Sequence, residues 1–71
     1  MFNLEVGQER EFFEPTHTED RAIPKGMRVR VSVIMTELLD EPRVTLVILG
    51  TKVPEVFTVA RHVVTLHSRL V

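Results

Sequence analysis

Three histidines are the side chains of this sequence best suited to metal binding or proton transfer: His17, His62 and His67. His62 and His67 are five positions apart, so they fall on opposite faces of a continuous strand and align poorly on a helix. His17 is near Glu19 and Asp20, but histidines in loops and at strand ends are common without a metal. The sequence has no cysteine, which excludes cysteine-based zinc sites. We therefore expect no metal and no cofactor.

Nucleophilic and acid–base catalysis also lack a recognisable arrangement. Ser32 and Ser68 are not part of a Gly-x-Ser-x-Gly nucleophile motif. Asp40 and Glu41 fall in an expected loop, where solvated carboxylates are more usual than a tuned acid–base pair. The three glycines are isolated, so there is no phosphate-binding loop. Because a chain of 71 residues seldom encloses a catalytic pocket alone, we expect no enzymatic activity and no catalytic residues.

Four arginines suggest an alternative function in nucleic-acid binding. Arg28 and Arg30 point the same way from one expected strand, Arg43 begins its neighbour, and Arg61 follows later. Together they could hold phosphates. Base-stacking aromatics are scarce, however, with four Phe and no Tyr or Trp. Residues 1–24 carry a net charge of −4 and residues 25–71 a net charge of +3, so pairing of these arginines with the acidic segment is the competing interpretation.

Two adjacent phenylalanines, Phe12 and Phe13, indicate a protein-contact surface. They lie in "REFFEP", with Glu11 and Glu14 on either side. Neighbouring residues of a strand point to opposite faces, so both cannot enter one core. One of them must be exposed or covered by a partner. We therefore predict protein contacts at Phe12 and Phe13, and at any sheet edge left open for strand addition.

The length and composition indicate one small domain over residues 1–71. A chain of this size buries a limited core, and without disulfides self-association is the favoured additional support. The longest apolar run, "VTLVIL", is far shorter than the ~20 residues that span a bilayer, and the first residues do not resemble a signal peptide. We expect a cytoplasmic protein with no membrane contact. Residues 1–24 are predicted to be a looser acidic hairpin and loop, and residues 25–71 the β core.

Alternation of apolar and polar residues predicts several strands. The clearest covers residues 27–36, where one face is apolar and Ile34 is the exception on the other; the apolar set is Val29, Val31, Val33 and Met35. Residues 43–50 are apolar on both faces after Thr45, which predicts a central strand covered on both sides. "PKG" at 24–26 predicts a turn. Residues 2–6 and 10–14 could form an N-terminal hairpin, and the polar residues 16–22 a loop.

The segment "PEVFTVARHVVTLHSRLV", residues 54–71, permits two interpretations. Its many β-branched residues favour a strand, a corner at Ala60–His62 and a second strand. Its apolar spacing and Pro54 would also suit one amphipathic helix. We favour the strand, corner and strand. The expected fold is mostly β, a five-stranded SH3-like barrel or a curled antiparallel sheet; the alternative is a β-hairpin core with a C-terminal amphipathic helix.

Two family resemblances accompany these patterns. "IPKGMRVRVSVIM", an apolar strand and "EVFTVARHVVTL" resemble the strand order of SH3-like small barrels over residues 23–68. That resemblance implies a tight turn at "ARHV" before a short closing strand, in an architecture that hosts peptide binders, nucleic-acid binders and assembly subunits. "KGMRVRVSV" and "VPEVFTVAR" are more weakly similar to the carbon storage regulator family of RNA-binding dimers. That similarity would make Arg61 an RNA contact, although Glu5 stands where the family's first strand is basic.

The sequence thus predicts a small, non-catalytic protein-interaction or self-assembling module, such as an accessory or regulatory subunit. Its expected partner is a second copy of itself or another protein. A small RNA- or DNA-binding regulator that uses the arginine-bearing sheet face is the alternative.

Overall fold

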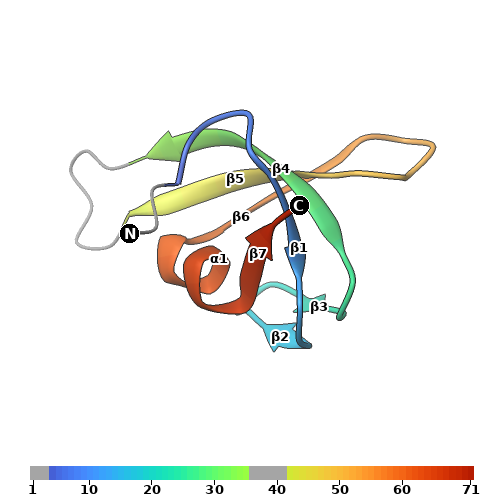
Figure 1. The fold of residues 1–71 in the computed structure, drawn as a ribbon, viewed down its shortest axis with the longest axis horizontal. Coiled ribbons are helices and arrows are strands. Elements are labelled where there is room, and N and C mark those ends of the chain that lie inside the picture. The colour runs from blue at the N-terminus through green and yellow to red at the C-terminus, as the bar shows by residue number, and fades with distance from the viewer. Residues whose placement is uncertain (1–3, 36–41) are drawn as a thin grey trace.

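The computed structural model describes residues 4–35 and 42–71. In these residues a curled five-stranded antiparallel sheet is accompanied by a two-stranded sheet and one short helix (Figure 1). The large sheet has the order β6-β5-β4-β1-β7 and is not closed into a barrel. Its strands are β1 (Glu9–Phe12), β4 (Arg28–Met35), β5 (Arg43–Ile48), β6 (Glu55–Ala60) and β7 (Ser68–Leu70). The mostly-β prediction is therefore confirmed, in its curled-sheet form.

The acidic N-terminal segment contributes a strand to the middle of this sheet. β1 pairs antiparallel with β4 on one side and with β7 on the other. The N-terminal hairpin predicted from residues 2–6 and 10–14 is wrong for the described part, because residues 4–8 form no strand and turn at Gly7, whose φ is +94°. Residues 1–3 lie outside the described residues. The partners of β1 thus come from distant parts of the chain.

A single apolar core fills the concave side of the sheet. Side chains from five strands and from the helix α1 (Arg61–His67) are buried there: Phe12, Ile23, Val29, Val31, Val44, Leu46, Ile48, Val59, Val63 and Val64. Leu4, Met27, Ile34, Phe57 and Ala60 pack against this cluster. β5 is an interior strand, as expected, but only one of its faces is covered, since Thr45 and Val47 on the other face are half-buried.

A β-bulge in β4 reverses the faces predicted for its second half. Val31 pairs with Leu46, but Val33 pairs with Thr45, so one extra residue is inserted between them. Beyond the bulge, Ile34 pairs with Val44 on the core side, whereas Val33 and Met35 are 46% and 39% exposed. The expectation that Val33 and Met35 share a buried face with Val31 is therefore wrong. An inserted residue shifts the two-residue period by one and exchanges the faces.

The C-terminal segment combines parts of both interpretations. "EVFTVA" forms β6 as expected, but residues 61–67 form α1 instead of a corner and a strand, and a short β7 follows. A corner would place the next strand beside β6, whereas β7 pairs with β1 at the opposite edge of the sheet. The chain must therefore cross the concave side, as α1 does in Figure 1. Val63 and Val64 of α1 are buried in the core. This tertiary burial outweighs the low helix propensity of β-branched residues.

The predicted loop at residues 16–22 contains a small hairpin made of β2 (Thr16–His17) and β3 (Ala22–Ile23). Thr18 organises its turn, because its hydroxyl donates to the Arg21 carbonyl at 3.0 Å and accepts from the Arg21 N–H at 3.1 Å. The "PKG" turn before β4 is confirmed, with a φ of +90° at Gly26. No helix among the described residues is long and apolar enough to cross a membrane.

Candidate functional site

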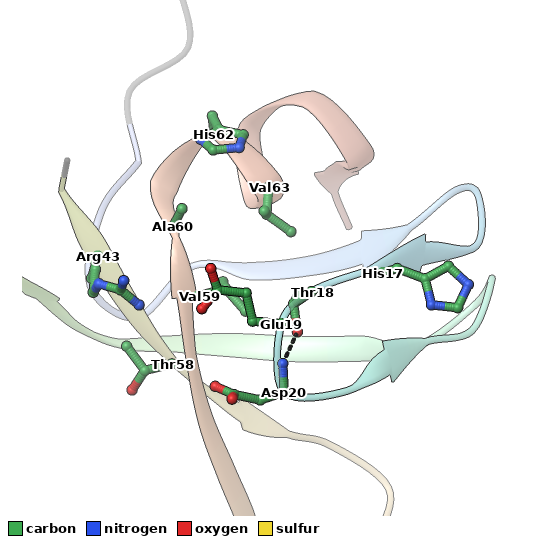
Figure 2. A pocket seen from close by; sticks show the side chains of 10 residues that line it. All are labelled: His17, Thr18, Glu19, Asp20, Arg43, Thr58, Val59, Ala60, His62 and Val63. Atoms are coloured by element: carbon green, nitrogen blue, oxygen red, sulfur yellow. Dashed lines mark hydrogen bonds between the residues drawn. The ribbon is translucent and has the colours of Figure 1, made fainter.

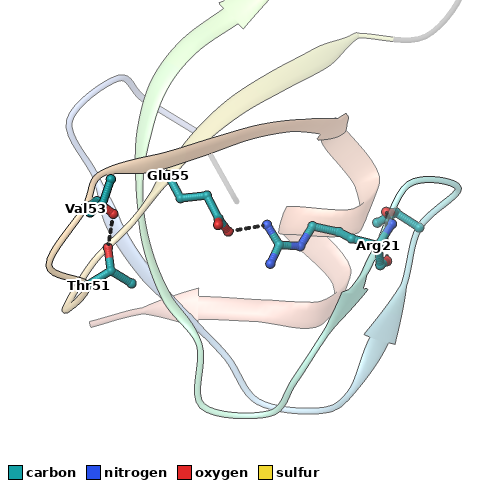
Figure 3. A network of polar contacts seen from close by, with 5 residues as sticks. Arg21, Thr51, Val53 and Glu55 are labelled. Atoms are coloured by element: carbon teal, nitrogen blue, oxygen red, sulfur yellow. Dashed lines mark hydrogen bonds and ion pairs between the residues drawn. The ribbon is translucent and has the colours of Figure 1, made fainter.

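Arg21 fastens the β2–β3 hairpin to the edge strand β6. Its guanidinium forms an ion pair with Glu55 at 2.9 Å, drawn in Figure 3, and its Cζ lies 4.7 Å from the centre of the Phe57 ring. The contact is a cation–π interaction as well as a salt bridge. Arg21 Nε is buried and has no hydrogen-bond partner among the described residues. The hairpin is thereby held at a set distance from β6.

A groove of about 270 Å³ lies between this hairpin and the junction of β6 with α1 (Figure 2). The hairpin forms one wall through residues 17–20, and the other side comes from the start of β5, the end of β6 and the start of α1. The residues on that side are Arg43, Thr58, Val59, Ala60, His62 and Val63. Buried Val59 and Val63 give the groove an apolar component between polar walls.

The charges of the groove differ from wall to wall. Glu19 and Asp20 are exposed on the hairpin and turn toward β6 in Figure 2, whereas Arg43 approaches from β5. None of these three side chains forms an ion pair within the described part of the chain. The groove therefore presents opposite, unneutralised charges beside apolar side chains. Sequence reasoning placed Glu19 and Asp20 in a polar loop, considered them with His17 as metal ligands, and missed this arrangement.

The histidines are not gathered at one place. His62 lines the groove, while the ring of His17, on the hairpin, points away from β6 (Figure 2). The Nδ1 atom of His67 contacts the Glu14 carboxylate at the end of α1. Within residues 4–35 and 42–71, no group of three His, Asp or Glu side chains is arranged to hold a metal ion.

The four arginines proposed for nucleic-acid binding form two separate pairs. Arg28 and Arg30 lie on the convex face beside β1, where Glu11 contacts Arg28 at 3.6 Å and Glu9 is the register partner of Arg30. Arg43 pairs with Ala60 at the other end of β5, and Arg61 is the next residue along the chain. Glu11 also binds Arg69 at 3.2 Å. Acidic side chains of β1 thus accompany one of the two pairs, as the competing interpretation expected.

The two phenylalanines have opposite environments. Phe12 is fully buried in the core, while Phe13 is 41% exposed. Their placement follows the alternation of β1, because the Phe12 side chain enters the concave side. Phe12 therefore cannot contact a partner in this conformation, and Phe13 is the member of the pair that a partner can reach.

A buried arginine at the N-terminal strand was not anticipated. Arg10 is 4% exposed, and its guanidinium donates to Ser68 Oγ at 2.8 Å and to the Ser68 carbonyl at 3.0 Å. Burial lowers the pKa of the Arg10 side chain. The sequence held a signal for this position, because Arg10 shares the two-residue period of Phe12 and so faces inward. Its contacts attach β7 to β1, which makes its role structural.

Comparisons with protein-family models, with curated proteins and with solved structures found no match to this chain. The candidate site therefore rests on its own geometry.

Proposed function

We propose that this chain is a non-catalytic protein-interaction module that holds an extended segment of a protein partner in the groove between the β2–β3 hairpin and β6. The observation that supports it most directly is the set of unpaired charges, Glu19 and Asp20 on one wall and Arg43 on the other. Exposed charges on both walls select a partner by charge complementarity. The half-buried Thr58 and Ala60 between them supply contact area.

The short strand β7, which follows β6 and α1 and pairs with β1, supports an SH3-like architecture for this module. A short helix stands between β6 and β7, where that resemblance expects a turn before a short closing strand. The contacts of Arg21 with Glu55 and Phe57 support a preformed groove, because they hold the hairpin against β6 before a partner binds. A preformed site loses less conformational entropy on binding.

Affinity capture from the native host, with the purified chain as bait, tests this proposal. We expect a protein to co-elute with the wild-type chain and to be lost with Glu19→Lys, which reverses a wall charge. Glu5→Lys is the matched control, because it makes the same charge change at an exposed position outside the groove. Its capture should equal that of the wild type.

Two results would contradict the proposal. Equal capture by the Glu19→Lys and Glu5→Lys variants would show that the groove is not the contact. Loss of the captured material after nuclease treatment, with binding that falls steeply as salt rises, would instead support nucleic-acid binding through the arginines.

A further inference from the structure

A second surface, which adjoins the groove at Thr58 and Arg43, lies on the convex face of β4, β5 and β6. We define the convex patch as the side chains of these strands that point away from the core between Arg30 and Arg43: Val33, Met35, Thr45, Val47, Val56 and Thr58. Register places them next to each other, since Val33 pairs with Thr45 and Thr45 with Thr58, while Val47 pairs with Val56. Directly paired residues share a face of the sheet.

The surface of the convex patch is mainly apolar, although two of its six residues are threonines. Val33, Met35 and Val56 are 46%, 39% and 59% exposed. The two threonines at its centre hydrogen-bond to each other, with 3.1 Å between the Oγ1 atoms of Thr45 and Thr58. Each hydroxyl therefore has a partner, and the methyl groups remain for contact. Contiguous apolar side chains of this kind mark interaction sites.

The bulge in β4 is what creates this surface. Without the residue inserted between Val31 and Val33, the alternation of β4 would turn Val33 and Met35 toward the core. Instead, two large apolar side chains are presented to solvent on a strand whose first half buries every second residue. Bulges often re-aim side chains near functional sites.

The charges beside the patch define the partner. Arg30 is the register partner of Val47 at one end, and Arg43 is the partner of Met35 at the other. Neither arginine forms an ion pair among the described residues. With about 3.3 Å per residue and about 4.8 Å between strands, their Cα atoms are about 14 Å apart. That separation matches two carboxylates about four positions apart on an extended chain.

The geometry points to a docking site for a protein segment that carries aliphatic side chains between two carboxylates. A second copy of this chain fits less well, because two identical convex faces would bring arginines against arginines. A nucleic acid would meet aliphatic side chains where single-stranded binders place aromatic ones. The site extends beyond the groove, since Arg30 and Val33 do not line the groove, although Thr58 and Arg43 do.

The probe is a synthetic extended peptide of alternating valine and threonine with two glutamates about four positions apart. Two control peptides replace the glutamates by lysines, or the valines by serines. Amide chemical shifts of the wild-type chain are followed by NMR during titration. We expect shifts at Val33, Val47 and Val56 with the acidic aliphatic peptide, and binding at least about tenfold weaker with either control.

Variants of the chain locate the site. We expect Arg30→Glu to lower the affinity for the peptide by about tenfold or more. The double variant Val33→Thr with Val56→Thr should lower this affinity by several-fold. Because Arg43 also lines the groove, Arg30 is the discriminating charge. Val53→Thr is the matched control, as Val53 is 75% exposed in the turn before β6 and off the patch. Arg30→Glu should leave capture of the groove's partner unchanged, because Arg30 does not line the groove, and this separates the two sites.

Several outcomes would overturn the inference. If the lysine peptide binds as tightly as the acidic one, the arginines do not recognise the carboxylates. If the serine peptide binds as tightly, the patch does not recognise aliphatic side chains. Chemical-shift changes confined to groove residues would place the peptide in the groove instead. If the wild-type chain is a dimer and the double variant Val33→Thr with Val56→Thr is a monomer, a second copy of the chain is the occupant. Displacement of the peptide by a single-stranded RNA, with a steep loss of RNA binding as salt rises, would make nucleic acid the occupant.

Discussion

At the scale of single residues, Arg10 shows how a buried charge can organise a chain end. Its Nε–H and one Nη2–H both donate to Ser68, to the hydroxyl and to the carbonyl. The planar guanidinium suits this two-point contact, whereas a lysine ammonium is a single point of charge. A carbonyl and a hydroxyl of β7 are thereby held by one side chain of β1.

We predict that Arg10→Lys lowers the free energy of unfolding by about 1.5–3 kcal/mol, the range for hydrogen bonds to charged groups. Urea denaturation measures it, with Arg69→Lys as the control for an exposed arginine at the same pair of strands. Arginine stays protonated in proteins although burial lowers the pKa of Arg10, so the loss should not change between weakly acidic and weakly basic pH. Equal stability of the two variants would refute the structural role of Arg10.

At the scale of elements, β4 separates into two halves with opposite facing. Val31 is fully buried before the bulge, and Val33 is half-exposed after it. We predict that Val31→Thr lowers the free energy of unfolding by about 1–3 kcal/mol, because a hydroxyl enters the core. Val33→Thr should stay within about 0.5 kcal/mol of the wild type. Urea denaturation measures both variants. If both lower the free energy of unfolding by a similar large amount, the alternation of β4 continues without a bulge.

The contacts of Arg21 that join the β2–β3 hairpin to β6 also belong to the scale of elements. Double-mutant cycles should assign about 0.2–1 kcal/mol to the Arg21–Glu55 pair and about 0.5–1 kcal/mol to the Arg21–Phe57 contact. High salt should reduce the coupling to Glu55, because both charges are partly exposed, and leave most of the coupling to Phe57. The cycles use Arg21→Ala with Glu55→Ala or Phe57→Leu. A coupling to Phe57 that vanishes with the ion pair would argue against the cation–π contact.

At the scale of the whole molecule, the predicted self-association depends on Phe13, because Phe12 lies in the core. We predict a dimer by light scattering at high micromolar concentration, and a monomer for Phe13→Ser, since a contact through this ring would lose its apolar area. Val6→Ser is the control, as Val6 is also exposed but lies in the turn before β1. A wild-type monomer over the whole concentration range would exclude self-association through this residue.

The distribution of charge is also a property of the whole molecule. The acidic N-terminal segment does not form a separate unit, because β1 inserts between β4 and β7 and brings Glu9 and Glu11 beside arginines. Its hairpin places Glu19 and Asp20 at the groove. The same acidic segment therefore pairs Glu11 with Arg28 and Arg69 and supplies a wall of the candidate site.

The sequence by itself determined the features that depend on neighbouring residues. The two-residue period specified the first half of β4 and the opposite facing of Phe12 and Phe13. The β-branched residues specified β6, while proline and glycine specified the turn at residues 24–26. These features follow from local backbone geometry, which each short segment contains in full.

Only the tertiary structure decided the bulge, the helix and the groove. The bulge depends on how β4 aligns with β5, and α1 exists because the chain must cross from β6 to the far edge of the sheet. The groove joins Glu19 and Asp20 to Arg43 and His62, which are far apart in sequence. Such features arise from contacts between distant segments, and no local pattern of residues contains that information.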